Sequence, residues 1–548
     1  MKLIKKIKYF KKGINMNRKK ILKVRIKFIS VLFSCCIAII IARLYYIQLG
    51  NKSDQYVSIA LNQYNFQYKT SNLNYKVLDD SNENLINCKT KYIVEIKSNI
   101  FKNFNNNIEM EKIFTFISIL RNYNEDFNLI KKFEENPNYN FKFEVDKYTY
   151  DKLKTLEEIN GVHLYEYNQF NENEAWSIEN IFIKEVSEKS TEDSYHEYIT
   201  ENKYPIIDFM NTKSGEQFVE NENNNFKLTI NKELQNGIEE IIRDEKYSQF
   251  DGIAVAISEA STGKIKALTQ KNEFNPNIML GSTTVGYVPG SIFKLVVAES
   301  ALDSGIFSQF NTFSCDNSRY DLCKGHKHGT LTIEEALAVS CNNIFAEIGR
   351  VIGWDYMLNY AQEQGIFSKV LGFSDFREVN GSYAEPKEYE DGPLFLSMGQ
   401  NMLIEPLQSL GIINTILNNG VYKELSLVDQ IVNENDEIIK SFKYDTKKVL
   451  KESTADVLKQ MLINTVENGT GKNIYFEDIE TGVKTGTTER FDGQNYVSDG
   501  WVLGYFKHRN KYYSMSVFVE NINEEGQYGG NTAGPIFRDI VEYFVTNF

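Results

Sequence analysis

Residues 289–294 read Pro-Gly-Ser-Ile-Phe-Lys, and the chain then continues to Ser304 without another Gly or Pro until Gly305. Pro-Gly is typical of a loop and Gly305 of a helix end, so the sequence predicts a helix between them. Residues three apart in a helix lie on one face. Ser291 would lie in the first turn, where unpaired N–H groups and the helix dipole favour a developing negative charge. Lys294 could accept its proton, provided that burial or another cation lowers the pKa of the amine.

A single match to a pattern as short as Ser-x-x-Lys is usually a surface serine and a solvated lysine. Two later motifs in the chain indicate that this pair is functional. The first is Ser340-Cys341-Asn342, which lies between two predicted helices; the earlier helix begins at Thr332, with Glu335 completing a capping box. The second is Lys484-Thr485-Gly486-Thr487-Thr488, in a run typical of a strand. Ser-x-x-Lys, Ser-x-Asn and Lys-Thr-Gly in this order form the signature of the penicillin-interacting serine acyltransferases.

Longer blocks around these motifs resemble the transpeptidase domain of class B penicillin-binding proteins, the monofunctional peptidoglycan D,D-transpeptidases. The blocks are PGSIFK, AVSCNNIF, MGQNMLIEPLQ and VKTGTTE, and the resemblance covers roughly residues 226–548. It implies an α+β fold, in which an antiparallel sheet has helices on both faces and a helical insert. It also implies an elongated, non-catalytic pedestal domain before the catalytic domain, and one N-terminal transmembrane helix.

The order of strands and helices in residues 226–548 also predicts an α+β domain. Two hairpins are expected, and a final helix that Gly534-Pro535 opens, since proline is favoured in a first helical turn. The predicted strands are 253–258 and 264–269 in the first hairpin, and 501–506 and 512–520 in the second. Strands at both ends with helices between them indicate one antiparallel sheet that is completed from both termini.

The resemblance implies acyl transfer through a serine. Ser291 would attack the carbonyl between the two terminal D-alanines of a peptidoglycan stem peptide, and Lys294 would accept its proton. Lys294 must be neutral for this, so the positive field of Lys484 and desolvation are expected to lower the pKa of its amine. Backbone N–H groups of Ser291 and Thr487 would form the oxyanion hole, and Ser340 would relay a proton to the leaving amine.

The other motif residues would bind the substrate. Asn342 would hold its backbone amide. Lys484, Thr485 and Thr487 would bind its terminal carboxylate. A Cβ on Gly486 would keep the substrate from pairing along that strand edge, so glycine is expected there. An amine from a second stem peptide would take the acyl group and form a crosslink, whereas β-lactams would acylate the same serine. No cofactor is required for the acyl transfer.

Two other functions use the same motifs. A β-lactamase or a D,D-carboxypeptidase would form the same acyl-enzyme but use water as the acceptor. The size of the region before the motifs and the expected membrane anchor argue against such a small hydrolase. A β-lactam sensor would use the domain only for binding, but it would need several membrane spans and a cytoplasmic effector. The sequence indicates a single span.

That span lies at the N-terminus. Residues 1–27 contain twelve Lys or Arg and no acidic residue, and they form the predicted cytoplasmic tail. Residues 28–49 follow as an apolar stretch of 22 positions that includes Arg43. This length can cross a bilayer, and the basic flank would keep the N-terminus in the cytoplasm. The protein is therefore expected to be a single-pass protein of the cell membrane, with everything after about residue 50 outside.

Three alternatives to an uncleaved anchor remain open. A cleaved signal peptide would need small residues soon after the apolar stretch, and Arg43-Leu44-Tyr45-Tyr46 is a poor site of that kind. A lipoprotein cysteine at Cys35 would lie in the middle of the apolar run. A buried core helix would not need the basic tail.

Charge excludes one class of partner. The net charge is −13, and without the twelve N-terminal cations the remainder is near −25. So acidic an exported region argues against nucleic-acid binding. The basic tail is better explained by membrane topology and by attraction to anionic lipid.

Residues 50–225 are expected to form the non-catalytic pedestal. Only three of the 33 glycines lie in the first 200 residues, and no catalytic constellation is found there. The Arg-Gly…Asp-Arg-Asn-Gly type of block, common near the start of this domain in the family, is absent, so partner surfaces known in relatives cannot be transferred. No glycosyltransferase domain fits into this region, and a separate glycosyltransferase of the cell-wall machinery is the expected partner.

A short cysteine- and histidine-rich run precedes the second motif. It reads Cys-x7-Cys-x2-His-x-His and consists of Cys315, Cys323, His326 and His328. Thiolate and imidazole at this density suit a tetrahedral zinc ion, and Cys341 or Asp316 could complete its shell. A disulfide between the first two cysteines and two unrelated structural cysteines are the alternatives. The run resembles a clostridial subset of these transpeptidases that carries zinc near the active site, which implies a structural zinc.

Overall fold

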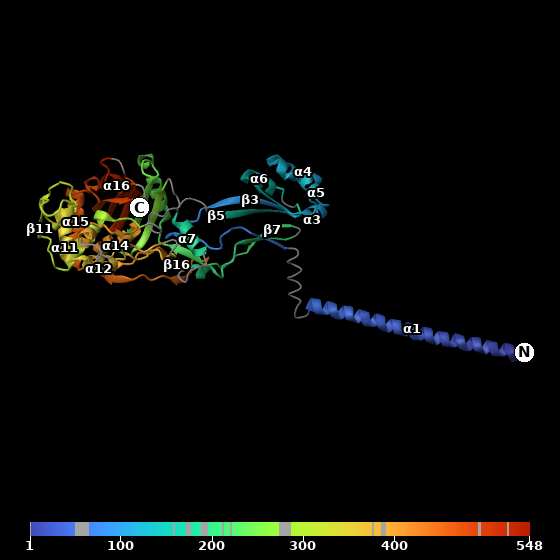
Figure 1. The fold of residues 1–548 in the computed structure, drawn as a ribbon. Helices are drawn as coiled ribbons and strands as arrows, with labels where there is room; N and C mark the ends of the chain where they lie inside the picture. Colours follow the sequence, from blue (N-terminus) through green and yellow to red (C-terminus); the bar gives the residue numbers. More distant parts are fainter. Residues whose placement is uncertain are drawn as a thin grey trace. The chain divides into compact units, whose positions relative to one another are not determined.

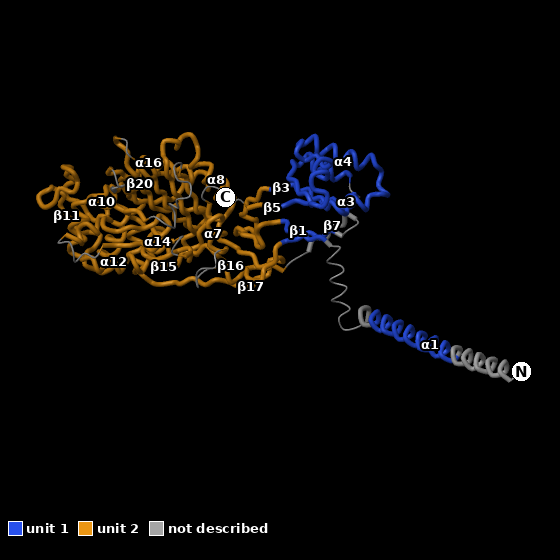
Figure 2. The backbone as a smooth tube through the Cα atoms, turned by 45° about the vertical axis from the view of Figure 1, so that its right-hand side comes forward, with its two compact units in different colours: residues 1–70, 90–167, 205–219 blue, residues 71–89, 168–204, 220–548 orange. Residues whose placement is uncertain are grey.

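The protein is described by a computed structural model (Figure 1). The described residues are 2–49, 65–156, 159–170, 177–187, 195–210, 213–219, 222–272, 286–374, 378–384, 391–491, 495–522 and 525–548. They form two compact units, coloured blue and orange in Figure 2. Unit 1 contains residues 1–70, 90–167 and 205–219, and unit 2 contains residues 71–89, 168–204 and 220–548. Both units are therefore built from separate pieces of sequence.

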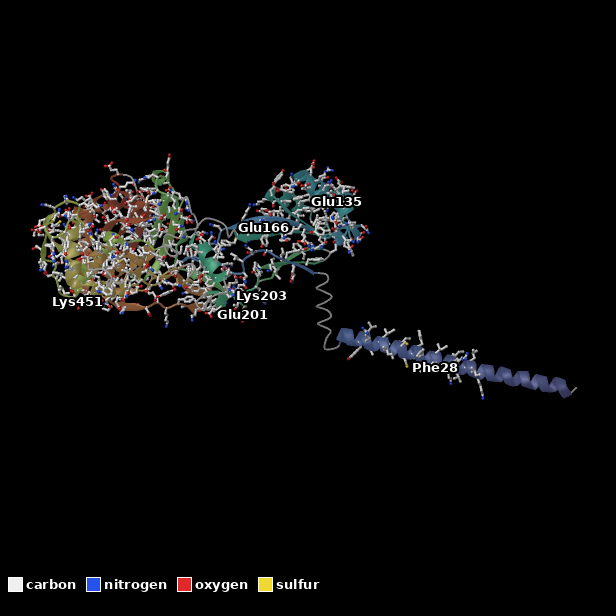
Figure 3. All side chains as sticks on the ribbon, viewed as in Figure 1. Phe28, Glu135, Glu166, Glu201, Lys203 and Lys451 are labelled. Carbon is white, nitrogen blue, oxygen red and sulfur yellow. The ribbon has the colours of Figure 1, made fainter. Side chains whose placement is uncertain are left out.

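The predicted apolar helix is present at the N-terminus. Helix α1 spans Lys2–Leu49, and its segment Lys20–Tyr45 is the one stretch of the described chain long and apolar enough to cross a membrane. None of that segment's most apolar window is buried, and Phe28 is 69% exposed. Figure 3 labels Phe28 on this helix. A helix with this composition fits a lipid environment, as expected for a single membrane anchor.

Unit 1 contains two small sheets. In the first, β3 lies between β4 and β5, and β3 and β4 are antiparallel. Alternating residues of β4 are buried, and Phe143 belongs to one hydrophobic cluster with Val94 of β3 and Phe116 of α4. The second sheet has the order β1-β6-β7. The bounds are β1 Asn65–Lys69, β3 Cys88–Ile96, α3 Ser98–Asn103, α4 Met110–Tyr123, α5 Leu129–Glu135, β4 Phe141–Val145, α6 Lys147–Lys154, β5 Val162–Phe170, β6 Ile206–Met210 and β7 Lys213–Val219.

Unit 2 is built on a five-stranded antiparallel sheet with the order β10-β9-β21-β20-β19. Its strands are β9 Gly252–Glu259, β10 Lys264–Asn272, β19 Thr481–Phe491, β20 Tyr496–His508 and β21 Lys511–Glu520. Both predicted hairpins are present, and strands from the two ends of the domain pair in the middle. The predicted α+β fold is confirmed. β19, which carries the Lys-Thr-Gly motif, is the last strand in the order.

Helices cover both faces of this sheet. On one face, α8 (Lys232–Ile242) and α16 (Gly529–Asn547) pack in one hydrophobic cluster with residues of β9, β20 and β21. On the other face, α14 (Pro406–Leu417) contacts β9, β20 and β21, and α15 (Glu452–Asn468) contacts β19. The sheet is consequently buried on both sides, and the residues of β20 from Val497 onward are almost all buried.

The final helix begins earlier than predicted. Gly534-Pro535 was expected to open it, but α16 begins at Gly529 and Pro535 lies inside it. The reason is packing, since an added Cβ on Gly529 would overlap the carbonyl oxygen of Gly486. Two glycines at the start of α16 let the helix begin directly against the sheet, so tertiary contact overrides the proline signal.

The predicted helical insert lies between β10 and β19. It includes η4 Gly290–Phe293, α9 Lys294–Asp303, α10 Ile333–Ala338, α11 Asn342–Ile352, α12 Trp354–Glu363, α13 Gly392–Ser397, α14 and α15, together with the short hairpin β11 Thr312–Cys315 and β12 Gly329–Thr332. The predicted capping box is present, because Thr332 and Glu335 bond reciprocally at the start of α10. A four-stranded sheet, β17-β16-β8-β2, completes unit 2. Its strands are β2 Val77–Leu78, β8 Asn225–Leu228, β16 Val428–Val432 and β17 Ile438–Ser441.

Candidate active site

Ser291 lies in a tight turn that leads into a buried helix. The turn is η4, a 3-10 turn, and Lys294 follows it as the first residue of α9. The Lys294 N–H donates to Ser291 O, which places the two residues one turn apart, as their spacing predicted. Ile292 and Phe293 between them are fully buried, whereas Ser291 is only partly buried. The serine is thus accessible and the lysine is buried.

Two glycines allow other segments to approach this turn closely. Gly290 has a φ of +56°, and an added Cβ there would overlap the side chain of Thr488 on β19. Gly399 has a φ of +71°, and an added Cβ would overlap the Gly290 backbone, whose N–H donates to Gly399 O at 3.1 Å. The Lys-Thr-Gly strand and the segment around Gly399 both pack directly against the turn of Ser291.

The buried amine of Lys294 contacts the second motif. Its Nζ donates to Ser340 O at 2.8 Å and to Asn342 Oδ1 at 2.6 Å, and it lies 3.2 Å from Ser340 Oγ. Lys294 is fully buried. Asn342 also donates to Leu322 O at 3.0 Å, so its amide is held from both ends.

The third motif reaches the same serine hydroxyl. Lys484 is fully buried on β19, and its Nζ donates to Ser340 Oγ at 3.0 Å and to Thr485 O at 2.6 Å. Ser340 has a φ of +55°, in the left-handed region that costs a non-glycine residue roughly 1 kcal/mol or more. Ser340 holds this strained backbone conformation at the point where its Oγ lies between the amines of Lys294 and Lys484. Lys294, Ser340, Asn342 and Lys484 therefore form one hydrogen-bonded cluster.

Burial changes the protonation of both lysines. It lowers the pKa of Lys294 from 10.5 to about 7, and the thiols of Cys341 and Cys323 oppose this shift. Burial also lowers the pKa of Lys484, and the charge of Lys294 lowers it further. The expected desolvation of Lys294 is thus present. The expected charge repulsion between the two amines is also present, as a lowering of the Lys484 pKa by the charge of Lys294.

The motif residues after Lys484 are held by neighbouring segments. The Thr485 hydroxyl donates to Thr470 Oγ1 at 2.6 Å, and Thr487 Oγ1 accepts from the Gly529 N–H at 3.0 Å. Gly486 has a second reason to lack a side chain, since an added Cβ would lie 3.3 Å from Ile292 Cγ2 and 3.4 Å from Pro289 O. The glycine thus favours close contact with the Ser291 turn, apart from the role toward a substrate that the sequence predicts.

The cysteine-rich run forms a compact cluster beside the second motif. Each of four residues offers one ligand atom, and these atoms all lie within 4.8 Å of one another; the residues are Cys315, Cys323, His328 and Cys341. Cys341 is the residue between Ser340 and Asn342. Contact with the Cys341 thiol and nearby backbone N–H groups lower the pKa of Cys323 and favour its thiolate, the form that binds zinc. Three thiols and one imidazole match the donor set of a structural zinc site.

His326, which the sequence also suggested as a ligand, is not in this cluster. Its side chain is exposed, and its ring lies 4.4 Å from that of His328. The Sγ atoms of Cys315 and Cys323 are 3.9 Å apart, well beyond the roughly 2 Å of a disulfide bond. Among the described residues, Asp316 is also not a member of this group of possible metal ligands.

Three residues at the site were not singled out from the sequence. Gly399 supports the turn of Ser291, Gly529 donates to Thr487, and Thr470 accepts from Thr485. Each lies far from its partner in the chain. Glycine pairs and Gly-Thr-Gly segments are weak signals, because such residues also mark ordinary turns.

The sequence matches one protein family over this part of the chain. The family is described as "Penicillin binding protein transpeptidase domain", and the match covers residues 252–542, more than half of the 548 residues. The chain belongs to this family. All three motifs of the cluster lie within the matched range, and the resemblance expected from their order is confirmed.

Curated relatives of this penicillin-binding protein family are moderately similar to the chain. Stage V sporulation protein D of Bacillus subtilis is 25% identical over an alignment of 347 residues, with 58% of this chain and 52% of that protein covered. The probable peptidoglycan D,D-transpeptidase PenA of Neisseria gonorrhoeae is 24% identical over an alignment of 333 residues, with 57% of this chain and 55% of the relative covered. The chain thus spans about half the length of these two curated relatives.

Solved structures of penicillin-binding proteins share the fold. A peptidoglycan synthetase from Bifidobacterium adolescentis has a TM-score of 0.62 at 16% identity, with 88% of this chain and 96% of that chain covered. A penicillin binding protein 3 from Mycobacterium, solved with aztreonam, has a TM-score of 0.59 at 14% identity, with 88% and 97% covered. The predicted class B architecture, with an N-terminal region before the transpeptidase domain, is confirmed as a fold.

Proposed function

We propose that this penicillin-binding protein is a serine D,D-transpeptidase, which crosslinks peptidoglycan stem peptides through an acyl-enzyme and is acylated by β-lactams. One observation carries the proposal: Ser340 Oγ lies within hydrogen-bond distance of both Lys294 Nζ and Lys484 Nζ, next to the turn of Ser291. A hydroxyl between two buried amines can pass a proton. The name of the PenA relative, a probable peptidoglycan D,D-transpeptidase, supports the same reaction.

Acylation would begin at Ser291. Its Oγ forms a bond to the carbonyl carbon between the two terminal D-alanines, and its proton goes to the neutral Nζ of Lys294. The lowered pKa of Lys294, about 7, supports a neutral amine at working pH. The negative charge that develops on the carbonyl oxygen is stabilised by the backbone N–H groups of Ser291 and Thr487. Loss of one such donor typically slows catalysis about 100- to 1,000-fold.

The leaving group needs the proton back. The bond between the acyl carbon and the amine of the last D-alanine breaks, and this amine takes a proton from Ser340 Oγ. Ser340 is in turn reprotonated by Lys294, which lies 3.2 Å from its hydroxyl. Lys484, 3.0 Å from the same oxygen, stabilises the negative charge that the hydroxyl carries during the transfer. The D-alanine then leaves, and the acyl-enzyme remains.

Recognition of the substrate would use the strand edge of β19. Asn342 holds the backbone amide of the stem peptide. Its terminal carboxylate binds Lys484 and the hydroxyls of Thr485 and Thr487. β19 is the last strand in the sheet order and can add an extended peptide, and Gly486 leaves space for it. In the second half-reaction, an amine of another stem peptide attacks the acyl carbon and gives its proton to Lys294. The bond between the acyl carbon and Ser291 Oγ then breaks, and Ser291 Oγ takes the proton from Lys294.

The acceptor distinguishes this function from its alternatives. A β-lactamase or a D,D-carboxypeptidase would pass the acyl group to water, so its penicilloyl form would hydrolyse quickly. A transpeptidase is expected to keep the penicilloyl group for many minutes, because water is a poor acceptor in a site shaped for an amine. Mass spectrometry of the penicilloyl protein over time measures this rate directly.

Labelling with a fluorescent penicillin tests the nucleophile. Wild-type protein is expected to carry one covalent label, and Ser291→Ala to carry none. Ser300→Ala is a matched control, since Ser300 lies on α9, the helix that follows the turn of Ser291, is fully buried and donates to Val296 O. A Ser291→Ala protein that still becomes covalently labelled would refute the assignment.

We further propose that the four-residue cluster binds a structural zinc ion through Cys315, Cys323, Cys341 and His328. The donor set and the spacing of the ligand atoms support this. Because Cys341 lies between Ser340 and Asn342, such an ion would hold the second motif against the end of β11, which carries Cys315, and the following loop, which carries Cys323. Metal analysis of the purified protein, before and after chelation, tests the proposal; absence of zinc together with a closed disulfide would end it.

The membrane arrangement is also a proposal. Residues 1–27 would form a cytoplasmic tail, residues 28–49 the membrane anchor, residues 50–225 the pedestal and residues 226–548 the extracellular catalytic domain. The basic tail and the apolar segment of α1 support it. A glycosyltransferase is the expected partner, since the acyl transfer links glycan strands that another enzyme must make. Protease protection of sealed spheroplasts would test the orientation, and digestion of the N-terminal tail from outside would contradict it.

A further inference from the structure

Thr470 links the second and third motifs. It lies in the segment Gly469-Thr470-Gly471, which follows α15 directly. Its N–H donates to Ala338 O at 3.0 Å, two residues before Ser340 in the chain. Its hydroxyl oxygen accepts a hydrogen bond from Thr485 at 2.6 Å. One residue thus contacts both segments whose side chains form the active cluster.

The neighbours of Thr470 make this approach possible. An added Cβ on Gly469 would overlap Ala338 O, and one on Gly471 would lie 2.6 Å from Val483 Cγ2. The N–H groups of both glycines donate to Thr465 O at 3.1 Å, which ties the segment to the end of α15. Glycine on each side allows the backbone to enter between the two motifs, and the side chain at position 470 points to Thr485.

The direction of the hydrogen bond is the informative detail. A hydroxyl has one hydrogen and two acceptor lone pairs. Thr487 Oγ1 accepts from a backbone N–H of Gly529, so its own hydrogen remains for a ligand. Thr485, in contrast, already donates its hydroxyl hydrogen to Thr470. Thr485 can donate to a ligand carboxylate only when this hydrogen bond reverses direction, so that Thr470 is the donor and Thr485 the acceptor.

We propose that Thr470 is a positioning residue for carboxylate recognition. It holds the Thr485 side chain in place, and when a carboxylate binds it donates its own hydrogen to Thr485, which then donates to the ligand. Two hydrogen bonds in series strengthen each other. This inference rests on the proposed function, in which Thr485 binds the terminal carboxylate of the substrate.

Two substitutions test the hydroxyl. Thr470→Val keeps the shape and the backbone N–H but removes the donor, and Thr470→Ser keeps the donor. With full-length protein in detergent micelles, the second-order rate of acylation by benzylpenicillin is expected to fall about 3- to 10-fold in Thr470→Val, the usual effect of one net hydrogen bond. Thr470→Ser should stay within about twofold of wild type.

A pair of reversible ligands separates positioning from general damage. An arylboronic acid that carries a carboxylate should bind Thr470→Val more weakly by the same 3- to 10-fold factor, about one hydrogen bond. The same boronic acid without the carboxylate should bind as it does to wild type. Thr465→Val is the control, because its hydroxyl is buried, donates to Met461 O within α15 and should affect neither ligand.

The outcomes distinguish this inference from the proposed function. If wild type is acylated but Thr470→Val keeps the wild-type rate and the wild-type preference between the two boronic acids, the role of Thr470 is overturned and the transpeptidase proposal stands. If both ligands weaken equally, Thr470 has only a structural role and the inference again falls. If wild-type protein is neither acylated nor able to distinguish the two ligands, both proposals fall.

Discussion

Lys294 and Lys484 approach the same atom: Ser340 Oγ lies 3.2 Å from the first amine and 3.0 Å from the second. Both lysines are fully buried. Two ammonium groups that both lie within hydrogen-bond distance of one oxygen would repel each other strongly in a low dielectric. Burial lowers the pKa of both, and the charge of Lys294 lowers the pKa of Lys484 further, so the site need not hold two cations at once. One amine can then accept a proton and the other can stabilise negative charge, with the Ser340 hydroxyl between them.

Acylation by a β-lactam is expected to increase with pH up to about 7. Burial lowers the pKa of Lys294 from 10.5 to about 7, so below this pH its amine is protonated and cannot take the proton of Ser291. The rate should rise about tenfold per pH unit in the acidic range and level off above it. Stopped-flow acylation between pH 5.5 and 9 measures the profile; a flat profile would contradict the role of Lys294 as base.

Gly399→Ala is expected to slow acylation at least about tenfold, since an added Cβ overlaps the backbone of Gly290 and must displace the turn of Ser291. Gly305→Ala is the matched control. Gly305 has a φ of +75°, close to the +71° of Gly399, but an added Cβ there meets nothing within 4 Å.

The strain of a positive φ is expected to lower the folding stability of both variants by roughly 1 kcal/mol. Only Gly399→Ala should change the acylation rate. Equal rates in the two variants, measured at equal folded fractions, would show that the contact with Gly290 does not position the serine.

Local patterns in the sequence were sufficient for much of unit 2. The capping box of Thr332 and Glu335 and the two hairpins depend on neighbouring residues, and the structure has them. The order of the three motifs indicated that they meet, because their chemistry is useful only together. These features need no knowledge of distant contacts.

Other features depend on contacts that a linear pattern does not contain. α16 begins at Gly529 because this glycine packs against Gly486, more than forty residues earlier in the chain. The pKa of Lys294 is lowered first by burial, and burial is a property of the folded domain. Likewise, spacing alone could not tell which of the two nearby histidines, His326 or His328, joins the cysteines.

Glu405→Gln is expected to stabilise the protein increasingly as pH rises. Glu405 is buried at the start of α14, and burial, with the charge of Glu378 as a second cause, raises its pKa from 4.5 to about 9. Between these values the folded state binds the proton and the unfolded state does not. Wild-type stability therefore falls with rising pH in this window, by up to about 1.4 kcal/mol per unit. The glutamine side chain does not titrate, so the variant does not lose stability in this way as pH rises.

Urea unfolding of the two proteins at pH 5 and pH 8 measures this difference. The stability advantage of Glu405→Gln should be larger at pH 8. Glu452→Gln is the control, since Glu452 is an exposed residue in the first turn of α15. An advantage for Glu405→Gln that does not change with pH would exclude a protonated carboxyl at this position.

The two neighbouring histidines give the sharpest test of the metal cluster. His328→Ala removes one of four ligand atoms that lie within 4.8 Å of one another, and it is expected to lose most bound zinc. It should lower the melting temperature by at least about 3 °C, roughly 2 kcal/mol for a domain of more than 300 residues. His326→Ala, two residues away and outside the cluster, should keep zinc and stability. Cys323→Ser should behave like His328→Ala, whereas Cys88→Ser, an exposed cysteine, should not. Equal zinc loss in both histidine variants would contradict this ligand set, because the same metal could not then depend on His328 alone.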